Sequence, residues 1–166
     1  MQKFLKIFGI IVLLLIIVGL VLDNSFEARR EIVIKTDRQT ALHYLQQQSN
    51  WQKWFPWMAM DPSVEVVSDN ESDKISWKGV TGGGQIINLK FKDDQIMFHF
   101  QLTGDESIFT NQIDIVSKGS DTKLIWQMNG EMSPIVVGNY FAQIMDGIMG
   151  QTMDSGLQQI KNNLQD

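Results

Sequence analysis

Two histidines are the first residues to consider for chemistry in this chain, because histidine can exchange protons near neutral pH. His43 and His99 fall in different predicted elements, and the chain contains no cysteine. A metal site would need several ligands at motif spacing, which these two residues do not supply. His43 is expected on an exposed helix face, and His99 alternates with Phe98 and Phe100, so it should face solvent. The sequence predicts no metal, no cofactor and no catalytic residue.

Two aspartates in a long predicted helix are the other candidates for acid–base chemistry. Asp146 and Asp154 lie eight positions apart. Asp146 is nearer to the apolar side of the helix, where partial burial could raise its pKa. We favour the alternative, in which Asp146 caps or ties a neighbouring loop. If the chain were an enzyme, Asp146 and His99 would be its candidate acid–base groups.

The helix that carries these aspartates is predicted over residues 133–164. Ser133-Pro134 is a typical start, because serine can cap a first turn and proline is tolerated at its first position. Apolar side chains recur three, four and seven positions apart, which predicts that they share one side of the helix. Together with Thr152, which falls on the same side, they are Phe141, Met145, Ile148, Met149, Met153, Ile160 and Leu164. The methionines among them fit either a packed core or the lining of an apolar cavity.

Glycines interrupt this helix, although glycine disfavours helix by about 1 kcal/mol relative to alanine. Gly138, Gly147, Gly150 and Gly156 could let the helix bend or let another backbone approach closely. Either property would suit a lid that opens for a ligand. Alanine at Gly147 and Gly150 is then expected to slow ligand exchange without loss of the fold.

A run of short strands precedes the helix. The strand pattern covers residues 27–35, 64–68, 74–78, 85–91, 95–102, 107–116 and 123–129, and short polar connections predict an antiparallel meander. Alternation groups Ile87 with Leu89 and Phe91, Ile96 with Phe98 and Phe100, Phe109 with Ile113 and Ile115, and Leu124 with Trp126 and Met128. The prediction is an α+β fold in which the long helix covers the apolar face of the sheet.

A tryptophan-rich segment separates the first strand from the meander. A short helix over residues 41–48, capped by Thr36-Asp37, leads into Trp51, Trp54 and Trp57. Prolines near these tryptophans stop any long helix. We favour a hydrophobic plug that closes one end of the core, and the alternative is the rim of a ligand pocket.

An apolar segment at the N-terminus predicts a membrane anchor. Residues 7–22 are uninterrupted apolar positions, and 4–22 includes only Lys6 as a charge. About 20 such residues cross a bilayer, whereas the apolar core of a signal peptide is usually about 7–15 residues. The run exceeds that range and no small-x-small cleavage site follows, so we favour an uncleaved anchor over residues 1–23 and a folded domain over 24–166. A cleaved signal peptide is the alternative.

The distribution of charge predicts orientation and excludes one class of partner. Lys3 and Lys6 precede the apolar run, which places the N-terminus in the cytoplasm and the domain outside it. Arg29 and Arg30, beyond the run, argue against this orientation. The segment after the run holds 12 of the 14 basic residues and all 19 acidic residues, a balance of −7. A nucleic-acid partner would favour a basic surface, so none is predicted.

Two groups of residues carry a resemblance to a known family. They are the segment from Trp51 through Trp54, Phe55, Pro56 and Trp57 with Asp61-Pro62, and the helical residues Tyr140-Phe141, Met145-Asp146-Gly147, Met149-Gly150 and Gly156-Leu157. Together with the element order, they resemble the SRPBCC superfamily of START-like and polyketide cyclase/dehydrase-like proteins. More narrowly, they resemble its bacterial members with one N-terminal transmembrane helix. The resemblance covers residues 27–164.

The resemblance implies a helix-grip fold, in which a curved antiparallel sheet of six to seven strands wraps the long helix around an apolar cavity. It implies a single-pass protein of the bacterial inner membrane, with the domain on the periplasmic or extracytoplasmic side. The leading prediction is non-catalytic binding or sensing of a hydrophobic small molecule or lipid, and the protein partner is unknown. Predicted ligand-binding residues are Trp57, Trp77, Leu89, Phe91, Phe98, Phe100, Phe109, Trp126, Phe141, Met145 and Met149.

Two other functions stay open at this point. The first is a cyclase- or hydrolase-like enzyme that uses the same cavity, which would require an acid or base that points into it. The second is a protein-interaction domain whose core is filled by its own side chains. A packed core would favour the interaction domain.

Overall fold

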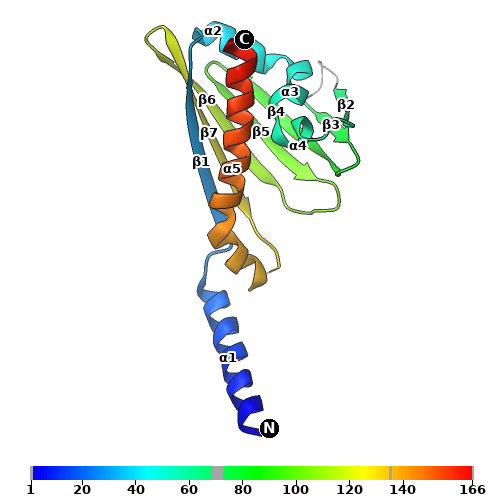
Figure 1. Cartoon of the computed structure of the whole chain (residues 1–166), viewed down its shortest axis with the longest axis vertical. Coiled ribbons are helices and arrows are strands. Elements are labelled where there is room, and N and C mark those ends of the chain that lie inside the picture. Colours follow the sequence, from blue (N-terminus) through cyan, green and yellow to red (C-terminus); the bar gives the residue numbers. More distant parts are fainter. Residues whose placement is uncertain (1, 69–72, 135, 166) are drawn as a thin grey trace.

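A seven-stranded antiparallel sheet and a long C-terminal helix form the body of the protein (Figure 1). The computed structural model describes residues 2–68, 73–134 and 136–165. Within them the strands are β1 (Ser25–Ile34), β2 (Glu65–Ser68), β3 (Ile75–Lys78), β4 (Gly83–Lys92), β5 (Gln95–Leu102), β6 (Phe109–Lys118) and β7 (Asp121–Glu131). Their order in the sheet is β1-β7-β6-β5-β4-β3-β2. The predicted α+β fold, with the helix against a curved sheet, is confirmed.

The face of the sheet that packs on the helix is apolar, as the alternation of side chains predicts. The predicted residues of β5, β6 and β7 are all buried, with Trp126 and Ile113 fully inaccessible. In β4 the prediction is wrong, because a register shift lies between Ile87 and Lys90 and Asn88 has a φ of 54°. An inserted residue of this kind is a β-bulge, which interrupts the alternation. Ile86 rather than Ile87 is therefore buried, together with Leu89.

Four short helical segments fill the concave side of the sheet beside the long helix (Figure 1). They are α2 (Arg38–Gln46), the 3₁₀ turn η1 (Gln48–Asn50), α3 (Trp51–Trp54) and α4 (Pro56–Ala59). Asp37 caps α2, because its carboxylate accepts a hydrogen bond from the Thr40 N–H at 3.0 Å. Trp51, Trp54 and Phe55 are fully buried, so this segment is part of the hydrophobic core.

The long helix α5 spans Val137–Gln165, so the predicted start at Ser133-Pro134 is wrong by four residues. Val136 has a φ of 78°, which a right-handed helix cannot contain. The Gly138 N–H instead donates to the Pro134 carbonyl at 2.7 Å. Ser133-Pro134 has the residue types of a helix start, but the chain makes a turn there and the helix begins at Val137.

The buried side of α5 agrees with the predicted one in part, because Met145, Met153 and Ile160 are buried and Met149 and Leu164 pack against the core. Phe141 and Ile148, predicted to face the core, are 50% and 49% exposed. The buried positions are Gly138, Asn139, Ala142, Met145, Gly150, Met153, Gly156, Leu157 and Ile160. Many of these are small, which lets the helix approach the sheet closely. The larger apolar residues Phe141 and Ile148 therefore lie on the exposed side of the helix and not at the contact with the sheet.

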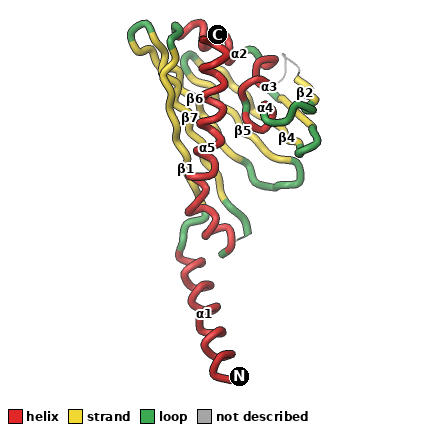
Figure 2. Tube along the Cα trace, viewed as in Figure 1, coloured by secondary structure: helices red, strands yellow, loops and turns green. Residues whose placement is uncertain are grey.

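Helix α1 (Gln2–Val21) projects from the end of the domain opposite to the C-terminus (Figures 1 and 2). Residues Lys3–Val21 are long and apolar enough to cross a membrane. The apolar side chains along this helix are largely exposed, as the values for Phe4 and Leu20 (76% and 60%) illustrate. Among the residues that the structure describes, none from α1 belongs to the buried apolar cluster of the domain.

Asp61 ties the segment after α4 to the loop that follows β3. Its Oδ1 accepts hydrogen bonds from the Ser63 hydroxyl and N–H at 2.5 and 2.9 Å, and its Oδ2 accepts from the Thr81 N–H and hydroxyl at 2.9 and 2.8 Å. These bonds, the Ser63 hydroxyl first, hold the pKa of the buried Asp61 carboxyl well below its usual value of 3.8.

Asp61→Asn is expected to lower the melting temperature by several degrees at pH 7, because an amide NH₂ would face one of the two donor pairs. The folded-state pKa lies below the unfolded value, so the stabilisation by the carboxylate is complete above about pH 5 and is lost as pH falls through the folded pKa. Melting curves of both proteins at pH 7 and pH 3 should show a narrower gap at pH 3. Glu65→Gln, at an exposed position of β2, is the control. An equal difference in melting temperature at both pH values would contradict the stabilising role of the Asp61 carboxylate.

Candidate functional site

A cavity opens at the end of the domain from which α1 projects. Its volume is about 1200 Å³, and it lies between the β5–β6 loop and the ends of β1 and β7 that are nearest to α1. We call it the end cavity. Its lining comprises residues 24–27, 102–108, Thr110 and 129–134. A cavity of this size is large enough for a small organic molecule or for part of a lipid.

The inner wall of the end cavity is apolar. Phe26, Leu102, Ile108 and Met132 line it, and Phe26 is buried while Ile108 is 50% exposed. Gly130 packs tightly against this wall, because a Cβ there would lie 2.7 Å from the Phe109 ring and 2.8 Å from the Phe26 ring. A side chain at Gly130 would therefore displace these rings.

Aromatic contacts lead from the end cavity into the core. The rings of Phe26 and Phe109 have centroids 5.9 Å apart, and Phe109 stacks on Phe100 at 4.9 Å. Trp57 follows, with its ring centroid 4.4 Å from that of Phe100. These rings form a continuous apolar path between the cavity wall and the tryptophan-rich segment.

The outer part of the end cavity is acidic. Glu27, Asp105, Glu106 and Glu131 lie among its lining residues, and no lysine or arginine is among the described residues that line it. The remaining polar contribution comes from serine, threonine and asparagine side chains. The electrostatic potential at this opening therefore favours neutral or cationic groups over anionic ones.

The ligand-binding residues predicted from the sequence do not line the end cavity. Seven of them are buried in the core: Trp77, Leu89, Phe98, Phe100, Phe109, Trp126 and Met145. Trp57 and Met149 are partly buried and pack against the same cluster. Phe91 and Phe141 are 37% and 50% exposed and lie outside it. The structure thus brings nine of the eleven together, as neighbours in one packed cluster.

The centre of the sheet's concavity is filled by aromatic side chains. The Trp54 ring lies 4.8 Å from Trp51 and 5.7 Å from Trp126, and Phe55 lies 6.0 Å from Phe98. We call these five residues the aromatic centre. The Trp126 N–H donates to the buried Asn111 side chain at 2.9 Å, which satisfies one polar group of this cluster. Of the two interpretations of the helical methionines, core packing applies to Met145 and Met153, which are buried in the core cluster.

The candidate acid–base residues lie away from the end cavity. His43 is exposed and contacts Gln47, and His99 lies on the outer face of the sheet beside Asn88. Asp146 is 59% exposed in its side chain and is paired with a cation rather than enclosed. None of these three residues is in the cavity lining.

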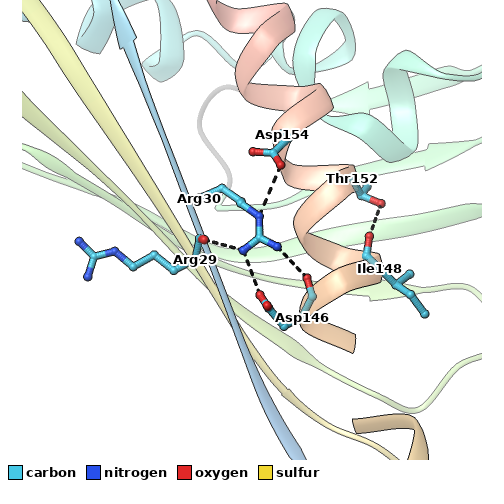
Figure 3. A network of polar contacts seen from close by, with 6 residues as sticks. All are labelled: Arg29, Arg30, Asp146, Ile148, Thr152 and Asp154. Carbon is cyan, nitrogen blue, oxygen red and sulfur yellow. Dashed lines mark hydrogen bonds and ion pairs between the residues drawn. The ribbon is translucent and has the colours of Figure 1, made fainter. Parts of the chain in front are cut away.

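Asp146 joins α5 to the edge strand β1 through Arg30 (Figure 3). The Arg30 guanidinium donates to the Asp146 carboxylate at 2.9 Å and to the Asp146 carbonyl at 3.1 Å. It also pairs with Asp154 at 3.4 Å and donates to the Arg29 carbonyl at 2.7 Å. The prediction that Asp146 caps or ties a neighbouring loop is wrong in its partner, because Asp146 is paired with Arg30 of strand β1.

Gly150 makes room for this guanidinium. A Cβ at Gly150 would overlap the Arg30 guanidinium, whereas a Cβ at Gly147 would meet nothing within 4 Å. Gly150 therefore permits a close approach, but the approaching group is a side chain and not the backbone that we predicted from the sequence.

Gly147→Ala is expected to stabilise the protein by about 0.5–1 kcal/mol through helix propensity. Gly150→Ala should gain the same amount but lose the Arg30 contacts, so its free energy of unfolding should fall short of that of Gly147→Ala. Arg30→Ala removes the obstruction, and in that background Gly150→Ala should stabilise as much as Gly147→Ala does. Urea unfolding of the four single and double variants measures both differences. If Gly150→Ala raises the free energy of unfolding equally with and without Arg30, then Gly150 is not needed to make room for the Arg30 guanidinium.

Sequence reasoning missed the end cavity because its lining comes from chain ends and loops rather than from a patterned element. Ile108 gave one usable signal, since it is an apolar residue next to the polar Thr103–Ser107 loop. The four carboxylates are spread over residues 27–131, so nothing in their spacing indicates that they share an opening.

Comparisons with known proteins identify the fold. No family model and no curated protein matches the chain. Solved structures match over most of it. The START superfamily protein from Mycobacterium smegmatis is 12% identical over 83% of this chain and 98% of its own, with a TM-score of 0.57.

Two enzymes are among the other matches. The Zhui aromatase/cyclase from Streptomyces sp. R1128 is 7% identical over 84% of this chain and 93% of its own, with a TM-score of 0.61. Norcoclaurine synthase from Thalictrum flavum, in complex with a transition-state analogue, is 11% identical over 84% and 94%, with a TM-score of 0.58. The protein therefore has the fold that START-like proteins and these two enzymes share.

Proposed function

We propose that α1 anchors the chain in a membrane as an uncleaved helix and that the domain binds a hydrophobic small molecule or lipid in the end cavity. The observation that carries this proposal is the position of the cavity. An apolar wall of Phe26, Leu102, Ile108 and Met132 lies at the end of the domain that adjoins α1. The anchor is that of a single-pass protein in a bacterial inner membrane, with the domain on the extracytoplasmic side.

The ligand is amphiphilic, and its polar end is neutral or cationic. Glu27, Asp105, Glu106 and Glu131 surround the opening, so an anionic head group would be repelled there. The apolar part of the ligand contacts the inner wall. A longer apolar tail that displaces the Phe26 ring would meet Phe109 and then Phe100, which belong to the ligand-binding set predicted from the sequence.

The fold is compatible with the binding of a small organic molecule. A synthase of the same fold holds a transition-state analogue, so the fold can accept a small organic molecule. The acid–base candidates Asp146 and His99 are absent from the cavity lining, which leaves the enzyme alternative without its named residues.

A direct binding experiment tests the proposal. The domain from Asn24 onward should fold alone, because the buried cluster includes no described residue of α1. It is titrated with a fluorescent long-chain amine and with the carboxylic acid of the same chain length and fluorophore. We expect both to bind and the amine to bind about tenfold more tightly at low salt, a difference of about 1.4 kcal/mol that shrinks as salt rises. If neither probe binds, the proposal is refuted. If the acid binds more tightly than the amine, the charge preference is refuted.

A second candidate function is a protein-interaction domain. The filled aromatic centre favours it, because Trp51, Trp54 and Phe55 occupy the concavity and are fully buried. In that case neither probe binds, and the domain co-purifies with a protein partner in place of a small molecule.

A further inference from the structure

The first half of α5 carries an apolar stripe that lies outside the described core cluster of the domain. Val137, Phe141, Ile144 and Ile148 are 53%, 50%, 53% and 49% exposed. Their spacings of four, three and four residues place them on one side of the helix. Single exposed apolar side chains are common, whereas a contiguous row of four large ones indicates an interaction site.

The stripe begins beside α1. A Cβ at Gly19 would lie 2.8 Å from the Val136 side chain and 2.9 Å from the Tyr140 ring, so the first turn of α5 packs directly on α1. The Tyr140 hydroxyl donates to the Leu15 carbonyl at 2.6 Å. Tyr140 therefore points along α1 toward the N-terminus, to a level about two turns before the apolar helix ends.

The polar side chains of this part of α5 serve the end of α1. The Asn139 amide donates to the carbonyls of Gly19 and Leu22, both at 2.7 Å. The Gln143 amide donates to the Asp23 carbonyl at 3.1 Å. Carbonyls in the last turn of a helix have no partner within the helix, and in a bilayer each would need one. Asn139 and Gln143 supply partners without a charge.

The composition of the segment agrees with this arrangement. No Asp, Glu, Lys or Arg occurs from Met132 to Met145. Gly19 lies about 4.5 Å below Leu22 along the helix axis, at 1.5 Å per residue. If the apolar run of α1 fills the hydrocarbon, the side chains of Val136 and Tyr140 contact α1 below the bilayer surface.

We propose that the N-terminal turns of α5 are embedded in the outer leaflet of the bilayer that α1 spans, with the apolar stripe facing lipid. Val137 and Phe141 lie within the leaflet, Ile144 lies at its surface, and Ile148 lies above it. This proposal rests on the proposed anchorage of α1. Its partner is the lipid of the same membrane, since the stripe continues from the lipid-facing surface of that helix.

The embedded segment fixes where the end cavity opens. Met132, Ser133 and Pro134 line the cavity and immediately precede the embedded turns. The opening therefore faces the head-group layer, and the domain takes its ligand directly from the outer leaflet. A lipid that leaves the leaflet would pass the four carboxylates before its tail meets the inner wall.

Spin labels on single cysteines test the insertion, because the natural chain has no cysteine. The full chain is reconstituted into phosphatidylcholine nanodiscs as the variants Leu14→Cys, Phe141→Cys, Ile148→Cys and Val116→Cys. Relaxation by oxygen, which concentrates in lipid, is compared with relaxation by a water-soluble nickel chelate. We expect the oxygen-to-nickel ratio to be several-fold higher at Phe141 than at Val116, with Leu14 higher still and Ile148 close to Val116.

The outcomes separate the insertion from the anchorage. A low ratio at Phe141 with a high ratio at Leu14 overturns the insertion and leaves α1 in the membrane. A low ratio at Leu14 overturns the anchorage itself. Dipolar broadening between Phe141→Cys labels, which disappears on dilution with unlabelled chain, would show that a second copy covers the stripe and would overturn the lipid assignment.

Discussion

Trp54→Ala should lower the free energy of unfolding by about 3–5 kcal/mol, the cost of removing a large aromatic side chain from a packed core. Trp54 is fully buried and contacts Trp51, Phe55 and Trp126 with ring centroids 4.8, 5.8 and 5.7 Å away. A domain of this size has a total stability of about 5–15 kcal/mol, so much of the protein would unfold at moderate denaturant concentration. Urea unfolding followed by circular dichroism measures the loss.

Trp54→Phe is the matched control. The Trp54 indole N–H is buried and has no hydrogen-bond acceptor among the described residues, so replacement of this ring by phenylalanine removes an unsatisfied donor. We expect the phenylalanine variant to lose less than half of what the alanine variant loses. A loss by Trp54→Ala below about 1 kcal/mol, far under the usual cost of such a truncation, would mean that the aromatic centre is loosely packed.

Ile108→Glu should weaken the binding of a neutral hydrophobic probe, such as N-phenyl-1-naphthylamine, by at least about tenfold. Ile108 lies in the wall of the end cavity and is 50% exposed, so the domain should tolerate the change while the wall gains a charge. A carboxylate that loses its water to an apolar ligand pays a large desolvation cost. Fluorescence titration of the domain measures the change in dissociation constant.

Val116→Glu controls for the added charge. Val116 is 44% exposed near the opposite end of β6 and is absent from the cavity lining. Its variant should bind the probe as the unmodified domain does. If Ile108→Glu and Val116→Glu bind equally well, the probe occupies some other site and the end cavity loses its role.

Most of the fold follows from local patterns in the sequence. Alternation in β5, β6 and β7 and the short polar connections are enough to predict the meander and its apolar face. The β4 strand defeats the same reasoning, because the bulge at Asn88 inserts one residue and exchanges the faces on which Ile86 and Ile87 lie. The alternation of side chains within one strand does not predict an inserted residue, because a bulge is defined by the pairing with the neighbouring strand.

The side on which α5 packs was the harder prediction. Periodicity groups Phe141 and Ile148 with Met145, but the sheet accepts the side that carries Ala142, Gly150 and Gly156. Hydrophobic periodicity ranks residues by type, whereas close packing depends on which small side chains let two backbones approach. The large residues that do not contact the sheet, Phe141 and Ile148 among them, form the exposed apolar stripe of α5.

The candidate site was the part that sequence reasoning did not reach. Aromatic residues predicted to line a pocket pack against one another, since the tryptophan-rich segment enters the concavity. The end cavity instead depends on how the β5–β6 loop stands away from the ends of β1 and β7. That separation is a property of tertiary structure, which no local spacing encodes.

Native mass spectrometry of the domain from Asn24 onward, purified gently from its own host, tests the central claim most directly. Our account predicts a co-purifying hydrophobic molecule with a neutral or cationic polar end, present on the unmodified domain and on Val116→Glu but lost from Ile108→Glu. A domain that carries no small molecule and binds no hydrophobic probe would contradict ligand binding in the end cavity.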